Sequence, residues 1–148
     1  MIRVVLAVCL TVALLAAVTP AVDEGRETRT AIHLDRVAER IDRAARSLHA
    51  HEDPTPPDVA GARRIVRFDL PARSWTAVGA RLWIDGERDA IGYRLDGRPA
   101  QRTRLRGIDL RTPAGRVVFD GAARYRLDLS LVRADGVGVV VTRGRGRG

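Results

Sequence analysis

The sequence predicts an α+β fold in which an N-terminal apolar segment runs into an amphipathic helix, followed by an antiparallel sheet of about six or seven short strands. Three observations lead to this prediction. Residues 4–22 contain no charged side chain. From residue 28 to residue 51, apolar side chains recur with a helical period. Beyond residue 62 they alternate with polar ones, which is typical of strands with one buried face.

Residues 1–22 are predicted to be a membrane anchor or a signal segment. Arg3 lies before the apolar run, and the first charges after it are acidic: Asp23, Glu24 and Glu27. This order orients the segment with its N-terminus in the cytoplasm, so the rest of the chain is expected outside the membrane.

Two interpretations of this segment stay open. An anchor needs about 17–25 largely apolar residues, and residues 4–22 meet that length. A cleaved signal peptide instead has an apolar core of about 7–15 residues followed by small residues. Thr19, Pro20 and Ala21 supply these, with cleavage before Val22. We therefore expect either a single-pass membrane protein with its C-terminal domain outside, or a secreted protein if cleavage occurs near Ala21.

Residues 23–53 are predicted to form the amphipathic helix. Its apolar positions are spaced by 3, 4, 3 and 4 residues, beginning at Leu34, and they include Ala44. The larger members form a candidate packing or assembly face: Leu34, Val37, Ile41 and Leu48. Two heptads are too few for a free coiled coil, so we expect this face to lie on the protein's own sheet, with packing against a neighbouring subunit as the alternative. Two pairs at i,i+4 spacing support the helix, Glu39 with Arg43 and Asp42 with Arg46.

A Pro-rich linker, residues 54–61, separates the helix from a β domain over residues 62–143, because Pro54, Pro56 and Pro57 cannot continue a helix. Alternation predicts seven strands, near 63–70, 79–85, 89–95, 100–105, 116–119, 123–133 and 137–143. Four Asp-Gly dipeptides fall between apolar runs and favour tight hairpins, at 85–86, 96–97, 120–121 and 135–136.

The chain carries a formal net charge of +8. All of its basic residues are arginine, and they are interleaved with aspartate. The densest points are Arg63-Arg64 and the stretch from Arg102 to Arg106, and no aromatic residue adjoins either of them in the sequence. Nucleic-acid binding is not expected, because single-strand binders combine such charge with stacking aromatics. The Arg-Gly tail, residues 144–148, is expected to be a solvated end.

No residue pattern predicts catalysis, a metal site or a cofactor. His33, His49 and His51 all fall in the predicted helix, and two residues at i,i+2 cannot share one helical face. Ser47, Ser74 and Ser130 lack the surroundings of an activated nucleophile. A single cysteine excludes an intrachain disulfide. We expect a protein that is not an enzyme and that uses no cofactor and no small-molecule ligand.

Trp75 stands between two strand patterns and has two interpretations. A large aromatic residue at this position can cover one end of the sheet, which is what we expect. The alternative is an exposed residue that recognises a partner.

An anchor, a continuous amphipathic helix and an antiparallel sheet form a layout that resembles type IV pilins and pseudopilins. Pro20 lies where the N-terminal helices of pilins often carry a proline. More closely, the chain resembles a family of small uncharacterised haloarchaeal proteins associated with type IV pilus and Tad-like secretion genes. The matching stretches are MIRVVL at 1–6, LPARSWT at 70–76, GIDLRTP at 107–113, and LSLV at 129–132 before Asp135-Gly136.

The resemblance implies a non-enzymatic, membrane-anchored, extracytoplasmic accessory protein, a pilin-like component of a type IV pilus or a secretion apparatus. Its partners would be pilus or secretion-system proteins, reached through the helix or a strand edge such as residues 137–143, and the membrane, reached through residues 4–22. A major filament subunit is not expected, since residues 4–22 lack the glutamate that such pilins carry. The alternative function is a secreted enzyme or ligand-binding domain released by signal-peptide cleavage.

Overall fold

A computed structural model describes residues 2–144 and contains one helix and eight strands. The helix is α1 (Ile2–His51). The strands are β1 (Arg63–Leu70), β2 (Ala80–Asp85), β3 (Ala90–Leu95), β4 (Gln101–Arg104), β5 (Leu110–Arg111), β6 (Val117–Asp120), β7 (Ala123–Ala134) and β8 (Gly136–Arg143). The α+β prediction is confirmed.

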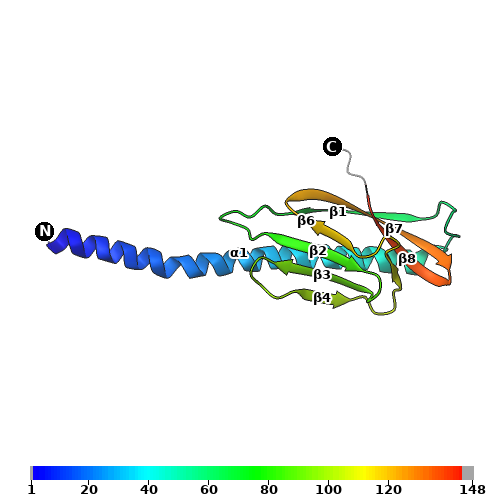
Figure 1. Ribbon diagram of the computed structural model, residues 1–148, viewed down its shortest axis with the longest axis horizontal. Helices are drawn as coiled ribbons and strands as arrows, with labels where there is room; N and C mark the ends of the chain where they lie inside the picture. The colour runs from blue at the N-terminus through cyan, green and yellow to red at the C-terminus, as the bar shows by residue number, and fades with distance from the viewer. Residues whose placement is uncertain (1, 145–148) are drawn as a thin grey trace.

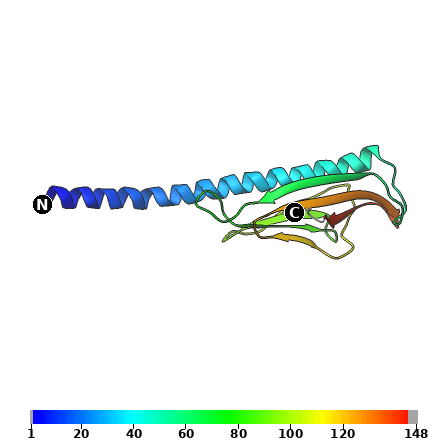
Figure 2. The same cartoon turned by 90° about the horizontal axis from the view of Figure 1, so that it is seen from above.

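The two predicted N-terminal segments form one continuous helix. At 1.5 Å per residue, the 50 residues of α1 make a rod about 75 Å long. Its first half protrudes from the β domain, and its second half runs along one side of the sheets (Figures 1 and 2). Pro20 lies within the helix without ending it. The helix ends at His51, just before the prolines of the linker.

The strands form two four-stranded sheets rather than the single sheet that alternation implied. Sheet A has the order β1-β7-β8-β5, and sheet B has the order β4-β3-β2-β6. All neighbouring strands are antiparallel except β5 and β8, which pair in parallel. The chain crosses between the sheets four times, after β1, β4, β5 and β6, and no local pattern marks those crossings.

All seven predicted strands are present, with bounds within one residue of those expected. Alternation did not predict β5, because a strand of two residues, Leu110–Arg111, is too short to alternate. It also misplaced the free edges of the sheets. The strand at 137–143 was expected to offer an edge, but β8 is paired on both sides, by β7 and by β5. One edge is therefore occupied by β7 along its length, and the other is occupied by β5 at Val139 and Val140.

Three of the four predicted Asp-Gly hairpins are present, and the fourth dipeptide connects the two sheets. Those at 85–86, 96–97 and 135–136 lie between antiparallel neighbours, as expected. Asp120-Gly121 instead joins β6 of sheet B to β7 of sheet A, so it is a crossing and not a hairpin. Gly121 has a φ of +84°, a backbone conformation that side-chain-bearing residues rarely adopt.

The core lies between the second half of α1 and the inner faces of both sheets. Three aromatic rings join the sheets, because Phe68 and Tyr125 come from sheet A and Phe119 comes from sheet B. The ring centroids of Phe68 and Phe119 lie 5.1 Å apart in an edge-to-face arrangement, as do those of Phe119 and Tyr125. The guanidinium of Arg143 lies 5.0 Å from the Tyr125 centroid and covers the cluster.

The ends of the β domain are attached to the rest of the fold. Thr55 of the linker bridges to β7, accepting a hydrogen bond from the Arg133 N–H at 2.8 Å. Glu52 pairs with Arg64 at 2.6 Å. The backbone N–H of Gly144 donates to the Arg126 carbonyl at 2.9 Å. The rest of the predicted Arg-Gly tail, 145–148, lies outside the described residues.

Candidate functional site

The candidate face predicted from the helix lies inside the molecule. The side chains of Leu34, Val37, Ile41 and Leu48 are fully buried, and they belong to the same core cluster as the strand residues of both sheets. Of the two uses considered for this face, the structure has the intramolecular one. The face is not available to a partner while the domain is folded.

The exposed apolar surface of the described chain lies instead on the first half of α1. Its large side chains are 54–84 % exposed from Ile2 to Val18: Ile2, Val4, Val5, Leu6, Val8, Leu10, Val12, Leu14, Leu15 and Val18. The hydroxyl group within this run is satisfied internally, because Thr11 donates to the Ala7 carbonyl at 2.9 Å. By length and composition, α1 qualifies as a membrane-spanning helix or as a signal sequence.

Just beyond this apolar half, α1 is joined to one end of the β domain. The Arg26 guanidinium donates to the Ser74 carbonyl at 3.1 Å, and the Val78 N–H donates to the Thr30 hydroxyl at 3.2 Å. Glu27 accepts a hydrogen bond from Arg98, in the turn between β3 and β4, at 2.6 Å. The loop between β1 and β2 and the turn after β3 therefore lie beside the part of the helix that directly follows the apolar run (Figure 1).

Trp75 lies in the β1–β2 loop with 79 % of its surface exposed. Our expectation that it covers one end of the sheet is wrong. The loop is nevertheless well defined, because the Ser74 N–H donates to the Ala77 carbonyl at 2.9 Å and the Thr76 N–H donates to the Ser74 hydroxyl at 3.3 Å. These bonds leave Trp75 and Thr76 at the tip of a tight turn.

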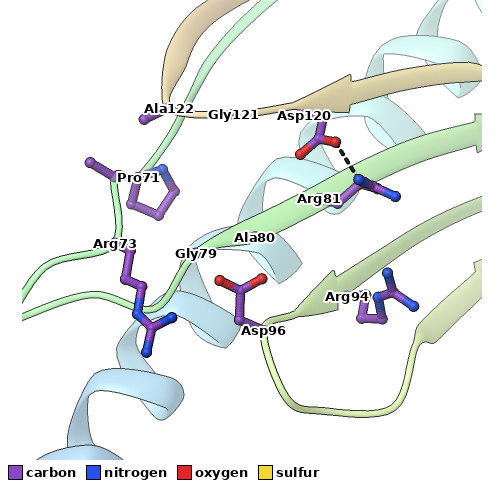
Figure 3. A pocket seen from close by; sticks show the side chains of 11 residues that line it. Pro71, Arg73, Gly79, Ala80, Arg81, Arg94, Asp96, Asp120, Gly121 and Ala122 are labelled. Atoms are coloured by element: carbon purple, nitrogen blue, oxygen red, sulfur yellow. Dashed lines mark hydrogen bonds and ion pairs between the residues drawn. The ribbon is translucent and has the colours of Figure 1, made fainter.

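A charged cleft of about 260 Å³ opens behind this turn (Figure 3). Its charged side chains come from four segments: Arg73 from the loop, Arg81 from β2, Arg94 and Asp96 from the end of β3, and Asp120 from β6. Arg81 and Asp120 form an ion pair. The Asp96 carboxylate lies against Gly79, where a Cβ would collide with it.

The cleft has the chemistry of a binding surface for charged groups. Arginine stays protonated at any physiological pH and acts as a donor only. The residues that line the cleft include no histidine, cysteine, serine or tyrosine. Such a site supplies charge and hydrogen bonds, from the arginines as donors and from Asp96 and Asp120 as acceptors.

A second hollow of about 260 Å³ lies on the outer face of sheet B, around the indole of Trp83. Four arginines line it: Arg81, Arg94, Arg102 and Arg116. Arg81 and Arg94 are direct cross-strand partners, an arrangement of like charges that destabilises a sheet. The indole packs flat over Gly92, where a Cβ would collide with the ring. The sequence indicated dispersed charge with no aromatic beside the Arg102 stretch, and the register of β2, β3 and β4 overturns this.

Asp85 is the buried charge of this face, with 4 % of its surface exposed. Its carboxylate accepts hydrogen bonds from Arg116 at 2.6 Å and from Arg88 at 3.1 Å. Burial by itself would raise the pKa of Asp85, but the bonds from the two guanidinium groups outweigh it, so the pKa lies below its ordinary value. Asp85 therefore stays ionised and neutralises part of the arginine cluster.

Two of the three histidines lie against backbone carbonyls. The His33 ring lies 2.8 Å from the Asp69 carbonyl of β1, and the His51 ring lies 3.2 Å from the Ser47 carbonyl at the end of α1. Ser74 is in the β1–β2 loop and Ser130 is in β7. Among residues 2–144, no group of three histidine, cysteine or acidic side chains is placed to hold a metal ion.

Sequence reasoning therefore missed the exposure of Trp75 and both clefts. The available signal for the second cleft was the alternation itself, since Arg81 and Trp83 occupy the same face of one predicted strand. Nothing local indicated that Arg94, Arg102 and Arg116 would join them.

Comparison with known proteins places the chain by family only. The model of a family described as a domain of unknown function (DUF7311) matches residues 1–145. No curated protein and no solved structure matches the chain.

Proposed function

Because the chain belongs to the DUF7311 family, whose members share a domain of unknown function, we propose its function from its own structure. The protein is a non-enzymatic component of a membrane-bound assembly, held by the first half of α1 and presenting its two-sheet domain on the extracytoplasmic side. The best model for its role is a pilin-like accessory subunit of a pilus or a secretion apparatus.

One observation carries the proposal: a single helix is apolar and exposed in its first half, and forms part of the domain core in its second. Exposed aliphatic surface on a soluble helix costs about 25 cal/mol for each Å² kept in water. A run of ten such side chains is unfavourable in water and favourable in lipid. Since the helix does not end between the two halves, the domain cannot swing freely about the anchor.

The charges at the ends of the apolar run support the extracytoplasmic side. Arg3 precedes it, whereas Asp23 and Glu24 follow it. Basic residues favour the cytoplasmic side of a membrane span.

The pilin-like role is supported by architecture. A protruding apolar half-helix and a second half packed against β-sheets (Figure 2) are the features by which the sequence resembles pilins and pseudopilins. In such an assembly the exposed half would pack against neighbouring helices after leaving the membrane.

Fractionation of the native host combined with mass spectrometry tests the anchor. We expect the protein in the membrane fraction after alkaline carbonate washing, with an intact mass that includes residues 1–22. A mature N-terminus at Val22 in the culture medium would contradict the anchor and support the secreted alternative.

Affinity purification from detergent-solubilised membranes tests the assembly, with membranes of a pilus-deletion strain as the control. Enrichment of pilin-like proteins or of a platform membrane protein, absent from the control, is the expected result. Recovery of the protein without them, together with normal piliation of a strain that lacks this protein, would contradict the pilin-like role.

A ligand-binding domain is a second candidate function, favoured by the arginine-lined hollow around Trp83. Arg94 and Arg102 have no ion-pair partner among the described residues, so this face retains positive charge that an anion would neutralise. Titration of the Trp75→Phe variant with inorganic pyrophosphate, followed by Trp83 fluorescence, tests this function. A saturable change that disappears in the added double variant Arg94→Gln, Arg102→Gln is expected, and an unaltered signal would contradict it.

A further inference from the structure

We propose that the β1–β2 loop (71–79) rests on the headgroup layer of the bilayer that holds α1, with the indole of Trp75 inserted among the headgroups. This inference rests on the proposed anchor and adds a second, off-axis contact between the domain and the lipid surface. It assigns a role to the most exposed aromatic side chain of the described chain.

The position of the loop along α1 places it at the right depth. The apolar run ends at Val22, and the 19 residues from Val4 to Val22 span about 28 Å at 1.5 Å per residue, close to the thickness of the hydrocarbon core. Arg26 lies four residues further on, about 6 Å above that boundary. The headgroup layer on each side is about 5–7 Å deep. Ser74, which Arg26 binds, therefore lies at the level of the headgroups.

The direction of side chains on a helix brings the loop still closer to the lipid. Side chains tilt toward the N-terminus of their helix, which here is toward the membrane. Arg26 follows this rule, because its guanidinium also pairs with Asp23, one turn nearer to the bilayer. A loop held by that guanidinium therefore lies closer to the bilayer than the Cα of Arg26 does.

Two contacts fix the loop against the helix and a turn fixes its tip. Ser74 is bound to Arg26 and Val78 to Thr30, so the end of the loop that carries Ser74 is the one nearer the membrane. The bond from the Ser74 N–H to the Ala77 carbonyl closes the turn and leaves Trp75 at its tip. A tip held in this way presents its side chain without further loss of loop entropy on contact.

The side chain has the chemistry of the interface. Tryptophan combines a large apolar body with one N–H donor, and it is enriched where membranes meet water. Beyond α1, the other exposed large apolar side chains, Val59, Ile65 and Val118, are 40–54 % exposed, whereas Trp75 is 79 % exposed. The Trp75 indole is thus far more exposed than these three aliphatic side chains, and it lies on the loop that is held nearest to the lipid.

A second lipid contact determines orientation. A single helix in a bilayer can tilt and rotate about its axis, and interfacial aromatic anchors restrict both. Because α1 is rigidly joined to the domain and Trp75 is inserted beside it, the domain could neither rotate about the helix axis nor tilt freely. Each face of the two sheets would then keep a fixed orientation relative to the membrane plane. A subunit that joins an assembly benefits because its docking surface is oriented before contact.

The test uses the full-length protein in phosphatidylcholine nanodiscs and compares it with the Trp75→Phe variant, so that the difference in emission belongs to Trp75. The chain has two tryptophans, and this design leaves Trp83 and the core unchanged. Nitroxide-labelled headgroups serve as the membrane quencher and iodide as the aqueous one. We expect the Trp75 emission to be quenched several-fold more strongly by the nitroxide than by iodide.

The Trp83 emission that remains in Trp75→Phe is measured with both quenchers and subtracted, because Trp83 is 8 % exposed but lies among four arginines that attract iodide. Strong quenching of Trp75 by iodide and weak quenching by the nitroxide, in protein that stays bound to the nanodisc, would overturn the inference and leave the anchor intact. Such a result would favour a protein partner for Trp75. Failure of the full-length protein to stay with the nanodisc would overturn both the anchor and the inference.

Discussion

Single residues of this chain carry charge in places where water is scarce, and Asp85 is the clearest case. It is buried at the end of β2, where Arg88 and Arg116 hold its pKa below the ordinary value. A carboxyl group whose pKa is depressed by folding stabilises the folded state above its unfolded pKa, and this contribution is lost as the pH falls through the folded value. The fold therefore depends on Asp85 being ionised.

The first prediction concerns this dependence. Asp85→Asn should lower the melting temperature at pH 7 and should flatten the fall in stability below about pH 4, which is near the unfolded pKa of aspartate. Thermal unfolding followed by circular dichroism from pH 7 to pH 2 measures both effects. Asp58→Asn, the same change at an exposed linker position, is the control and should follow the parent chain. Identical pH profiles for Asp85→Asn and the parent would contradict this account.

Tyr93 provides a second test at the scale of the residue. Its hydroxyl donates to Asp35 at 2.8 Å and lies 2.9 Å from the Gln101 side-chain oxygen. Burial, followed by the hydrogen bond and charge of Asp35, raises the pKa of Tyr93 to about 12. A raised pKa means that the interaction stabilises the fold below pH 10 and is lost as the pH rises toward 12.

Tyr93→Phe should cost about 1 kcal/mol of stability at pH 7. It should also remove the tyrosinate absorbance that rises near pH 12 in the parent chain. Asp35→Asn is the matched control, since it keeps the phenol and should move the same absorbance change to lower pH. An unchanged titration in Asp35→Asn would show that Asp35 does not set this pKa.

At the scale of the element, the two halves of α1 have different surface patterns. Its first half has an apolar surface all round, as a membrane helix requires. Its second half has a single buried stripe with polar residues elsewhere, including the predicted pairs Glu39–Arg43 at 3.6 Å and Asp42–Arg46 at 3.0 Å. The residues between Asp23 and Thr30 carry both the change of pattern and the contacts to the β1–β2 loop.

The third prediction compares two sites on this helix. Ile41→Asp should unfold the domain, because Ile41 is fully buried and an unpaired carboxylate in the core costs several kcal/mol. Ile32→Asp is the matched control on the same helix, where Ile32 is 45 % exposed and the change should be tolerated. Chemical denaturation measures both free energies of unfolding. Equal stabilities would show that the stripe does not pack on the sheets.

At the scale of the whole molecule, the buried core and the exposed apolar half of α1 occupy separate parts of the chain. Every residue of the buried core cluster lies between Leu34 and Val141. The exposed apolar half of α1 contributes nothing to that cluster. The domain is thus stabilised by its own packing, without the apolar half of α1.

The fourth prediction follows from this separation. A chain that begins at Asp23 should be soluble without detergent, and its melting temperature should stay within a few degrees of that of the full-length protein in detergent micelles. A chain that begins at Asp35 is the control, because it loses Leu34 and the contacts of Arg26 and Thr30, and it should be clearly less stable. Aggregation of the longer fragment would contradict the independence of the domain.

The sequence by itself determined the local features of this protein. The apolar run, the helical stripe and the bounds of seven strands follow from periodicities of 2 and 3.6 residues, which the backbone imposes within a few residues of any position. The buried stripe on α1 was readable for the same reason, since one face of a helix must be covered.

Only the tertiary structure decided what depends on residues far apart in the chain. The division into two sheets and the parallel strand β5 depend on pairings such as Leu110 with Val139. The arginine hollow depends on the register that places Arg94 opposite Arg81, and the exposure of Trp75 depends on which neighbour its loop binds. Alternation tells a strand which face is buried but not which strand lies beside it, because the hydrogen bonds of a sheet edge are the same for every partner.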